Sequence, residues 1–110
     1  MQELMMSTHN IYVIELSQEV LTNKKFRDAN PDYISGKPLA YVGMTSRTPK
    51  ERFLQHKAGY KSARLVRKFG IRLKPRQYTS LNPMTYNEAV KMEKLKTKQL
   101  RKRGWGVWSN

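Results

Sequence analysis

Two helix-capping boxes constrain the fold of this chain more than any other feature. Thr48-Pro49-Lys50-Glu51 and Thr85-Tyr86-Asn87-Glu88 each place a threonine three residues before a glutamate. In this pattern each of the two side chains accepts a hydrogen bond from the other residue's backbone N–H group, so each box fixes where a helix begins. The first predicted helix runs to about Lys57, and the second is the longest and ends near Gly104.

β-branched and aromatic residues predict strands on either side of the first helix. Residues 11–16 and 39–43 are typical of strands, and residues 72–80 are predicted as an edge strand because Pro75 cannot donate to a central ladder. Apolar spacing predicts a further helix over 62–69. The order β, β, α, α, β, α indicates an α/β sandwich around a small, mainly antiparallel sheet.

Turn residues dominate the segment between the first two predicted strands. Asn30-Pro31-Asp32 and Ser35-Gly36-Lys37-Pro38 predict an inserted loop over residues 17–38, with room for a short helix. The tail at 105–108 either folds back onto the core or stays exposed. With 110 residues, we expect a single domain over 1–110.

The charge balance points to a polyanionic partner. Lys and Arg number 22 against 8 Asp and Glu, a formal net charge of +14. An anionic membrane surface would also suit this charge, but no stretch approaches the roughly 20 apolar residues of a transmembrane helix, so we expect no membrane partner. The absence of cysteine excludes disulfides and thiolate zinc sites, and it fits a reducing cytoplasm. Nucleic acid is the favoured partner, with four basic residues as candidate contacts: Lys50, Lys57, Lys61 and Arg64.

Arg52 and His56 are four residues apart on the first predicted helix, so they project from the same face. An Arg fork suits a phosphodiester that gains charge in a transition state, and an imidazole can donate a hydrogen bond or move a proton. The alternative interpretation is an ordinary solvated helix face.

Glu93 is predicted on the core-facing side of the long helix, although it is charged. On a helical wheel it falls among a mostly apolar stripe: Tyr86, Ala89, Val90, Thr97 and Leu100. Because an unpaired buried charge is costly, we expect Glu93 to meet a cation. That cation is either a metal ion or an arginine such as Arg52, and a plain salt bridge is the simpler alternative.

Two tyrosines lie in the predicted strands. Tyr12 and Tyr41 are each explained by core packing with a satisfied hydroxyl when considered alone. Gly43 follows in the second strand, where a glycine permits close backbone approach or a positive φ, or simply marks a turn.

Taken in order, these residues resemble the GIY-YIG endonuclease family. The resemblance rests on Asn10-Ile11-Tyr12, Tyr41-Val42-Gly43, Arg52 and Glu93, and it spans about residues 10–100. The chain departs from the pattern at Asn10, where the family name has Gly, and its 17–38 interval is longer than in compact members.

The resemblance implies a three-stranded antiparallel sheet flanked by helices, and phosphodiester hydrolysis with one divalent ion. Glu93 would hold Mg²⁺ or Mn²⁺ with water filling most remaining positions, and Arg52 would stabilise the phosphate. Tyr12 would act as general base, Tyr41 would orient water or phosphate, and His56 stands where some members carry a catalytic His or Tyr.

The family pattern also includes an Asn after the metal-binding helix. Asn110 is the only Asn at such a place, and the sequence leaves its role unassigned.

These observations predict a divalent-metal-dependent endonuclease that acts on DNA. One alternative is a non-catalytic basic nucleic-acid-binding module of the same fold, and another is a protein that binds structured RNA. A domain of this size would gain long-site specificity from a homodimer or a partner protein.

Overall fold

A four-stranded sheet in the order β3-β1-β2-β4 forms the centre of the structure, a computed structural model that describes residues 6–110. The strands are β1 (Asn10–Leu16), β2 (Leu39–Thr45), β3 (Gly70–Leu73) and β4 (Gly106–Ser109). β1 pairs antiparallel with both β2 and β3, whereas β4 pairs parallel with β2. The fold is therefore α+β with a mixed sheet, and an expectation of three antiparallel strands leaves out β4.

The C-terminal tail folds back as this fourth strand. Leu39 pairs with Gly106 and Tyr41 with Trp108, so the tail adds a strand to the sheet on the side of β2 that β1 does not occupy. A four-residue strand that follows a helix directly is too short to show a period-2 pattern, and this is why the sequence left the tail undecided.

Both predicted capping boxes are complete and begin the two longest helices, α2 (Pro49–Ala58) and α4 (Tyr86–Lys102). In each box the threonine Oγ1 accepts from the glutamate N–H at 3.1 Å. The predicted helix over 62–69 is observed as α3 (Arg64–Phe69).

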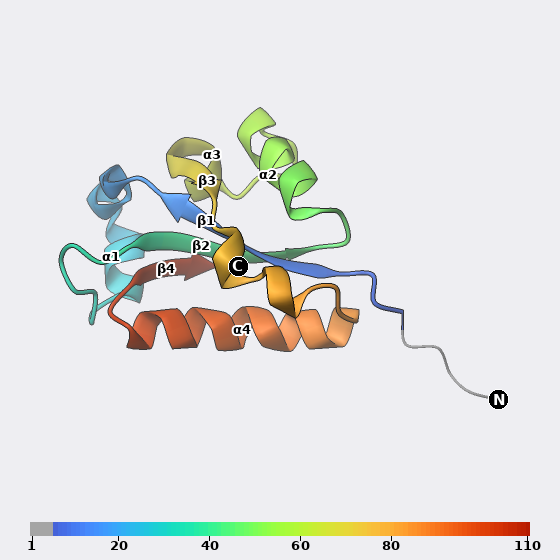
Figure 1. Cartoon of the computed structure of the whole chain (residues 1–110). Helices are drawn as coiled ribbons and strands as arrows, with labels where there is room; N and C mark the ends of the chain where they lie inside the picture. Colours follow the sequence, from blue (N-terminus) through green and yellow to red (C-terminus); the bar gives the residue numbers. More distant parts are fainter. Residues whose placement is uncertain (1–5) are drawn as a thin grey trace.

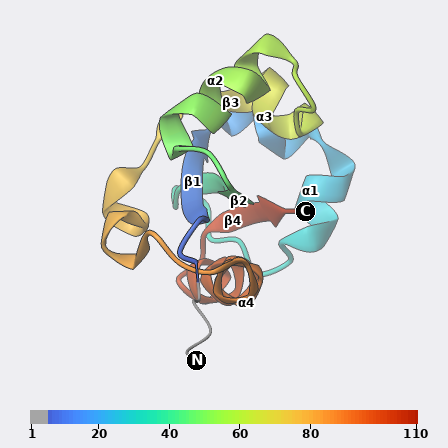
Figure 2. The ribbon, with the colours of Figure 1, turned by 90° about the vertical axis from the view of Figure 1, so that its right-hand side faces the viewer.

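Helices cover both faces of the sheet. α4 packs along one face, whereas α2 and α3 lie on the opposite side (Figures 1 and 2). The sheet thus holds the apolar core between two helical layers. None of the helices within residues 6–110 has the length and apolar character needed to cross a membrane.

The interval between β1 and β2 is structured rather than a loop. It holds the 3₁₀ helix η1 (Gln18–Thr22) and the helix α1 (Lys24–Ala29). Asn30 follows α1 and is buried, and its Oδ1 accepts from Val107 N at 2.8 Å and from Arg101 Nε at 3.1 Å. The segment therefore covers the outer edge of β4, which would otherwise present an unpaired backbone.

β3 is an edge strand, but it is shorter than the predicted 72–80. It ends at Leu73, and Pro75 begins the first of two 3₁₀ turns, η2 (Pro75–Gln77) and η3 (Thr79–Leu81). Asn82 then continues the pairing through its side chain, accepting from Ile11 N and donating to Ile11 O, both at 2.8 Å. The side-chain amide of Asn82 thus bonds to the β1 backbone beyond the point where β3 ends, whereas the sequence predicted a longer edge strand.

Candidate active site

Tyr12, Tyr41 and His56 form a buried cluster on the α2 side of the sheet. Tyr12 pairs with Gly43 and Ile14 with Tyr41, so both phenol rings project from one face. α2 brings His56 over them, with ring centroids 6.0 Å from Tyr12 and 5.7 Å from Tyr41. Each of the three side chains is 1 % exposed. We call these three residues the tyrosine–histidine cluster.

Gly43 is required by this cluster. A Cβ at this position would overlap the Tyr12 hydroxyl and ring and would press on the Tyr41 ring at 2.9 Å. The sequence allowed Gly43 a close backbone approach, a positive φ or a turn. The structure shows the first of these, because the Tyr12 side chain approaches the β2 backbone at Gly43.

Hydrogen bonds fix the protonation pattern of His56. Its Nδ1 accepts from the backbone N–H of Ala63 at 3.0 Å, and its Nε2 lies 2.8 Å from the Tyr12 Oη. Because a neutral imidazole carries one proton and Nδ1 is the acceptor, Nε2–H must donate to Tyr12. His56 therefore holds the Tyr12 oxygen as a donor and cannot remove its proton.

Burial keeps His56 neutral. Desolvation, helped by the positive charge of Arg52, lowers the pKa of His56 to about 4. The alternative of a solvated helix face is therefore wrong for His56, which lies in the core.

The two phenols are also held in their protonated form. Burial raises the pKa of Tyr12 to about 12, Arg52 opposes this shift, and the charge of Glu93 adds to it. Burial likewise raises the pKa of Tyr41 far above its ordinary value, with Tyr12 and Glu93 adding to the shift and Arg52 opposing it. The charges of Arg52 and Glu93 thus act in opposite directions on the pKa of both hydroxyls.

Arg52 is fixed by the turn that follows α2. Its Nη1 donates to Gln55 Oε1 at 3.1 Å and to Tyr60 O at 3.2 Å, and its Nη2 donates to Lys61 O at 2.7 Å. A guanidinium has five N–H groups, so these bonds leave the Nε–H and one Nη2–H for another acceptor. The guanidinium is thus held in place and keeps part of its fork available.

Glu93 is half-buried on α4, between buried Ala89 and Leu100. Burial raises the pKa of its carboxyl, and Lys94 opposes this shift. Within residues 6–110 no ion pair involves Glu93, so the salt bridge to Arg52 that the sequence allowed is not observed. The core-facing stripe is confirmed except at Tyr86, which is exposed.

The carboxylate of Glu93 fits one kind of metal site. Residues 6–110 contain no group of three or more His, Asp or Glu side chains that could enclose an ion. A partly desolvated carboxylate without an ion-pair partner suits a hard divalent cation that keeps most of its water ligands. Mg²⁺ or Mn²⁺ held by Glu93 alone is compatible with this environment, whereas an all-protein cage is not.

Asn110 joins the site through a contact that the sequence left unassigned. Its Nδ2 donates to the Tyr41 Oη at 2.8 Å. The only signal for it in the sequence was its place as the single Asn after the long helix.

The four predicted nucleic-acid contacts differ in their surroundings. Lys50, Lys61 and Arg64 are exposed on α2, the following turn and α3. Lys57 instead donates to Arg67 O at 3.1 Å and to Gly70 O at 2.9 Å, at the end of α3. Its ammonium therefore links α2 to the end of α3 through two hydrogen bonds.

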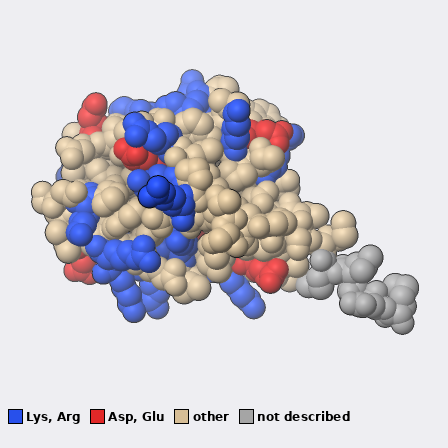
Figure 3. All heavy atoms as spheres, viewed as in Figure 1, with Lys and Arg blue, Asp and Glu red and all other residues tan. Residues whose placement is uncertain are grey.

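On the face of the molecule drawn in Figure 3, Lys and Arg side chains are more numerous than Asp and Glu side chains.

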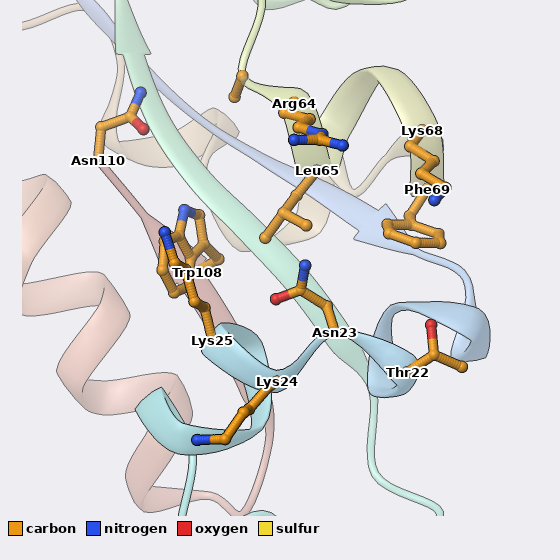
Figure 4. A pocket seen from close by; sticks show the side chains of 11 residues that line it. Thr22, Asn23, Lys24, Lys25, Arg64, Leu65, Lys68, Phe69, Trp108 and Asn110 are labelled. Carbon is orange, nitrogen blue, oxygen red and sulfur yellow. The ribbon is translucent and has the colours of Figure 1, made fainter.

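A hollow of about 530 Å³ lies beside the cluster, and we call it the basic groove (Figure 4). α1 and α3 form its walls, Trp108 comes from β4, and Asn110 follows that strand. Its lining residues are Thr22, Asn23, Lys24, Lys25, Ala63, Arg64, Leu65, Lys68, Phe69, Trp108 and Asn110. Of the predicted contacts only Arg64 lines it. Its other cations are Lys24 and Lys25 of α1, in the interval predicted as an inserted loop, and Lys68 of α3.

Comparisons of this chain with protein-family models, with curated proteins and with solved structures found no match.

Proposed function

We propose that the protein is a divalent-metal-dependent endonuclease that hydrolyses phosphodiester bonds in DNA, with a GIY-YIG-like site. The observation that carries this proposal is the contact of Tyr12, Tyr41 and His56 on one face of the sheet. The charges of Arg52 and Glu93 both affect the pKa values of the two tyrosine hydroxyls there. Perturbed pKa values in a group of this composition are typical of sites that move protons.

Tyr12 is the proposed general base. The Nε2–H of His56 points at its oxygen, and this donor and the positive charge of Arg52 both favour the phenolate, against the larger opposing effect of burial, which raises the pKa of Tyr12 to about 12. For this role Tyr12 must first lose its phenol proton to hydroxide from solvent. The phenolate then takes a proton from water as the water oxygen attacks phosphorus, and the P–O bond to the leaving strand breaks, with the departing oxygen taking a proton from solvent. His56 acts by positioning Tyr12 and by stabilising its charge.

Tyr41 is the proposed donor that orients water or phosphate. Asn110 Nδ2–H already occupies an acceptor site on its oxygen, so the Tyr41 O–H proton is directed to another acceptor. Its raised pKa keeps that proton in place at neutral pH.

Arg52 is the proposed phosphate ligand. Its two remaining N–H groups can bind phosphate oxygens while Tyr60 O and Lys61 O hold the fork. A Mg²⁺ or Mn²⁺ ion held by Glu93 would supply Lewis-acid chemistry and lower the pKa of bound water.

Plasmid cleavage with matched variants tests this proposal. Wild-type protein with Mg²⁺ or Mn²⁺ should nick supercoiled plasmid, and Glu93→Gln and Arg52→Lys should not. Glu19→Gln and Arg76→Lys remove the same chemistry at exposed positions away from the cluster and should cleave like wild type. Equal cleavage by wild type, Glu93→Gln and Arg52→Lys would overturn the assignment.

Two observations favour a non-catalytic nucleic-acid-binding module as the second candidate. Three N–H groups of Arg52 bond to its own chain, and burial opposes ionisation of Tyr12. Binding of DNA with a steep salt dependence, without cleavage at any metal concentration, would favour this module.

A further inference from the structure

The basic groove lies next to the tyrosine–histidine cluster on the same face of the sheet. Trp108 pairs with Tyr41 across the parallel β2–β4 ladder, so both side chains project from that face. Asn110 lines the groove and also donates to the Tyr41 Oη at 2.8 Å. The end of the groove is thus one side chain away from a hydroxyl of the cluster.

The walls of the groove carry positive charge from two directions. Lys24 and Lys25 come from α1, and Arg64 and Lys68 come from α3 on the other side (Figure 4). No Asp or Glu is among the lining residues, although Lys24 pairs with Asp28 just outside at 2.7 Å. Lys25, Arg64 and Lys68 are therefore the cations available to an anionic ligand.

Apolar and aromatic surface lies between these cations. Leu65 and Phe69 are buried, whereas the ring of Trp108 is only half-buried and lines the hollow. Cations along a groove with an aromatic ring inside are the arrangement that binds single-stranded nucleic acid, because bases stack on the ring while phosphates meet the cations. A base inside a duplex is stacked and paired and cannot reach a ring recessed between two helices.

A second basic hollow, of about 470 Å³, lies along α4 and lacks these features. Its lining residues are Asp32, Lys94, Thr97, Lys98, Arg101, Lys102 and Ser109. It contains a carboxylate and no aromatic ring, so it offers charge without a surface for a base.

We propose that the basic groove binds an unpaired DNA strand, with phosphates on Lys25, Arg64 and Lys68 and a base on Trp108, and that it leads this strand toward Tyr41. This inference deepens the proposed function. Delivery of the strand for cleavage rests on that proposed function, whereas binding of the strand in the groove does not. The substrate would then be DNA with an unpaired segment beside the cleavage point, such as a flap or a branched junction.

Strand binding without metal tests the groove independently of cleavage. Fluorescence anisotropy of labelled oligo(dT) and of a duplex of equal length compares two triple variants. The groove variant carries Lys25→Gln, Arg64→Gln and Lys68→Gln. The control carries Lys37→Gln, Arg76→Gln and Lys91→Gln, exposed positions outside the groove with the same loss of charge.

Wild type and the control should bind oligo(dT) more tightly than duplex. The groove variant should bind oligo(dT) about tenfold or more weakly than wild type. Its log–log salt slope should fall by about 2, because each phosphate of a single strand that the protein neutralises contributes about 0.7 to that slope. Equal losses in the two triple variants would show general charge attraction and would overturn the inference.

The second readout is the fluorescence of Trp108. A Trp105→Phe variant leaves Trp108 as the only tryptophan, because the chain has two. Oligo(dT) should quench this signal, and a duplex should leave it nearly unchanged. Quenching equal for both, or absent for oligo(dT), would remove the stacking role.

Two further arms separate the groove from the proposed function. Oligo(rU) bound ten or more times as tightly as oligo(dT) would overturn the assignment to DNA. A loss of oligo(dT) binding in the groove variant would uphold the groove even if wild type cleaved no DNA at any Mg²⁺ or Mn²⁺ concentration. Plasmid cleavage by a groove variant that still binds oligo(dT) like wild type would overturn the groove and leave the nuclease standing.

Discussion

The tyrosine–histidine cluster and the basic groove lie side by side, yet they are built in opposite ways. The cluster is almost fully desolvated, its members are neutral, and hydrogen bonds hold each of its rings. The groove is open and carries its charge on exposed side chains of two short helices. A small domain can thus separate proton chemistry, which needs fixed geometry, from affinity for phosphates, which long flexible cations supply.

Burial explains why the two regions cannot exchange roles. A cation inside the cluster would lose its solvation without a partner, whereas a phenol or a neutral imidazole is stable there when its polar atoms are bonded. Within the described residues no buried side-chain N or O lacks a hydrogen-bond partner. We therefore expect changes in the cluster to alter turnover or stability, and changes in the groove to alter affinity.

Removal of the Tyr12 hydroxyl should have the largest effect. Tyr12→Phe keeps the ring but deletes the proposed base, so kcat for DNA cleavage should fall about 10²–10⁴-fold, the usual contribution of general acid–base catalysis. Tyr86→Phe, at an exposed position of α4, is the matched control and should retain wild-type kcat. A Tyr12→Phe variant with wild-type kcat would refute the role of Tyr12 and leave the cluster as core packing.

Acid should destabilise the protein through His56. Its pKa is lowered from 6.5 to about 4 on folding, so between these values the unfolded chain binds a proton that the folded chain does not. The contribution of His56 to the free energy of unfolding should then be complete above pH 6.5. It should fall by up to about 3 kcal/mol as the pH drops to 4.

Urea unfolding at a series of pH values measures this effect. His56→Gln should flatten the dependence between pH 6.5 and 4.5, whereas His9→Gln, which removes the other histidine, should keep it. An unchanged slope in His56→Gln would contradict the buried neutral imidazole.

Gly43→Ala should strain the cluster from the backbone side. The new Cβ would overlap the Tyr12 ring and hydroxyl, and overpacking of this kind costs about 1–3 kcal/mol of unfolding free energy. In a Tyr12→Leu background the far end of the ring is gone, so the same Gly43→Ala change should cost much less. Equal costs in both backgrounds, measured by urea unfolding, would show that the two residues do not interact.

The sequence predicted those parts of the fold that depend on local chemistry. The capping boxes at Thr48 and Thr85 placed α2 and α4, and β-branched and aromatic residues placed β1 and β2. The register that pairs Tyr12 with Gly43 comes from the structure alone. β4 was left undecided, because the pairing of Trp108 with Tyr41 joins residues far apart in the chain and no local pattern encodes it.

The candidate site shows the same limit. Tyr12 and Tyr41 were named as candidates through the family resemblance, and His56 also through its spacing from Arg52; the structure brings the three into contact. A short helix was allowed for within residues 17–38, but the cations of α1 were missed as candidates, because only tertiary packing brings Lys24 and Lys25 opposite α3. Asn110 had no periodic pattern to place it, since its partner is a side chain on another strand.

The groove variant with Lys25→Gln, Arg64→Gln and Lys68→Gln should separate the two regions kinetically. KM for a flap substrate should rise about tenfold while kcat changes little, since uniform binding energy is removed and the reacting atoms are untouched. The triple control at Lys37, Arg76 and Lys91 should leave both constants near wild type. A fall in kcat without a rise in KM would mean that the groove and the cluster are one site rather than two.

The smallest effect should come from Asn110, whose side chain lines the groove and donates to Tyr41 of the cluster. Asn110→Ala removes a single hydrogen bond to the Tyr41 Oη, which is worth about 1 kcal/mol or about fivefold in kcat. Asn87→Ala, at an exposed position of α4, is the control and should change neither constant. Because Asn110 lines the groove only at its end, KM should move less than kcat. A change in KM alone would place Asn110 with the strand-binding surface, and it would contradict the role of its amide in directing the Tyr41 proton.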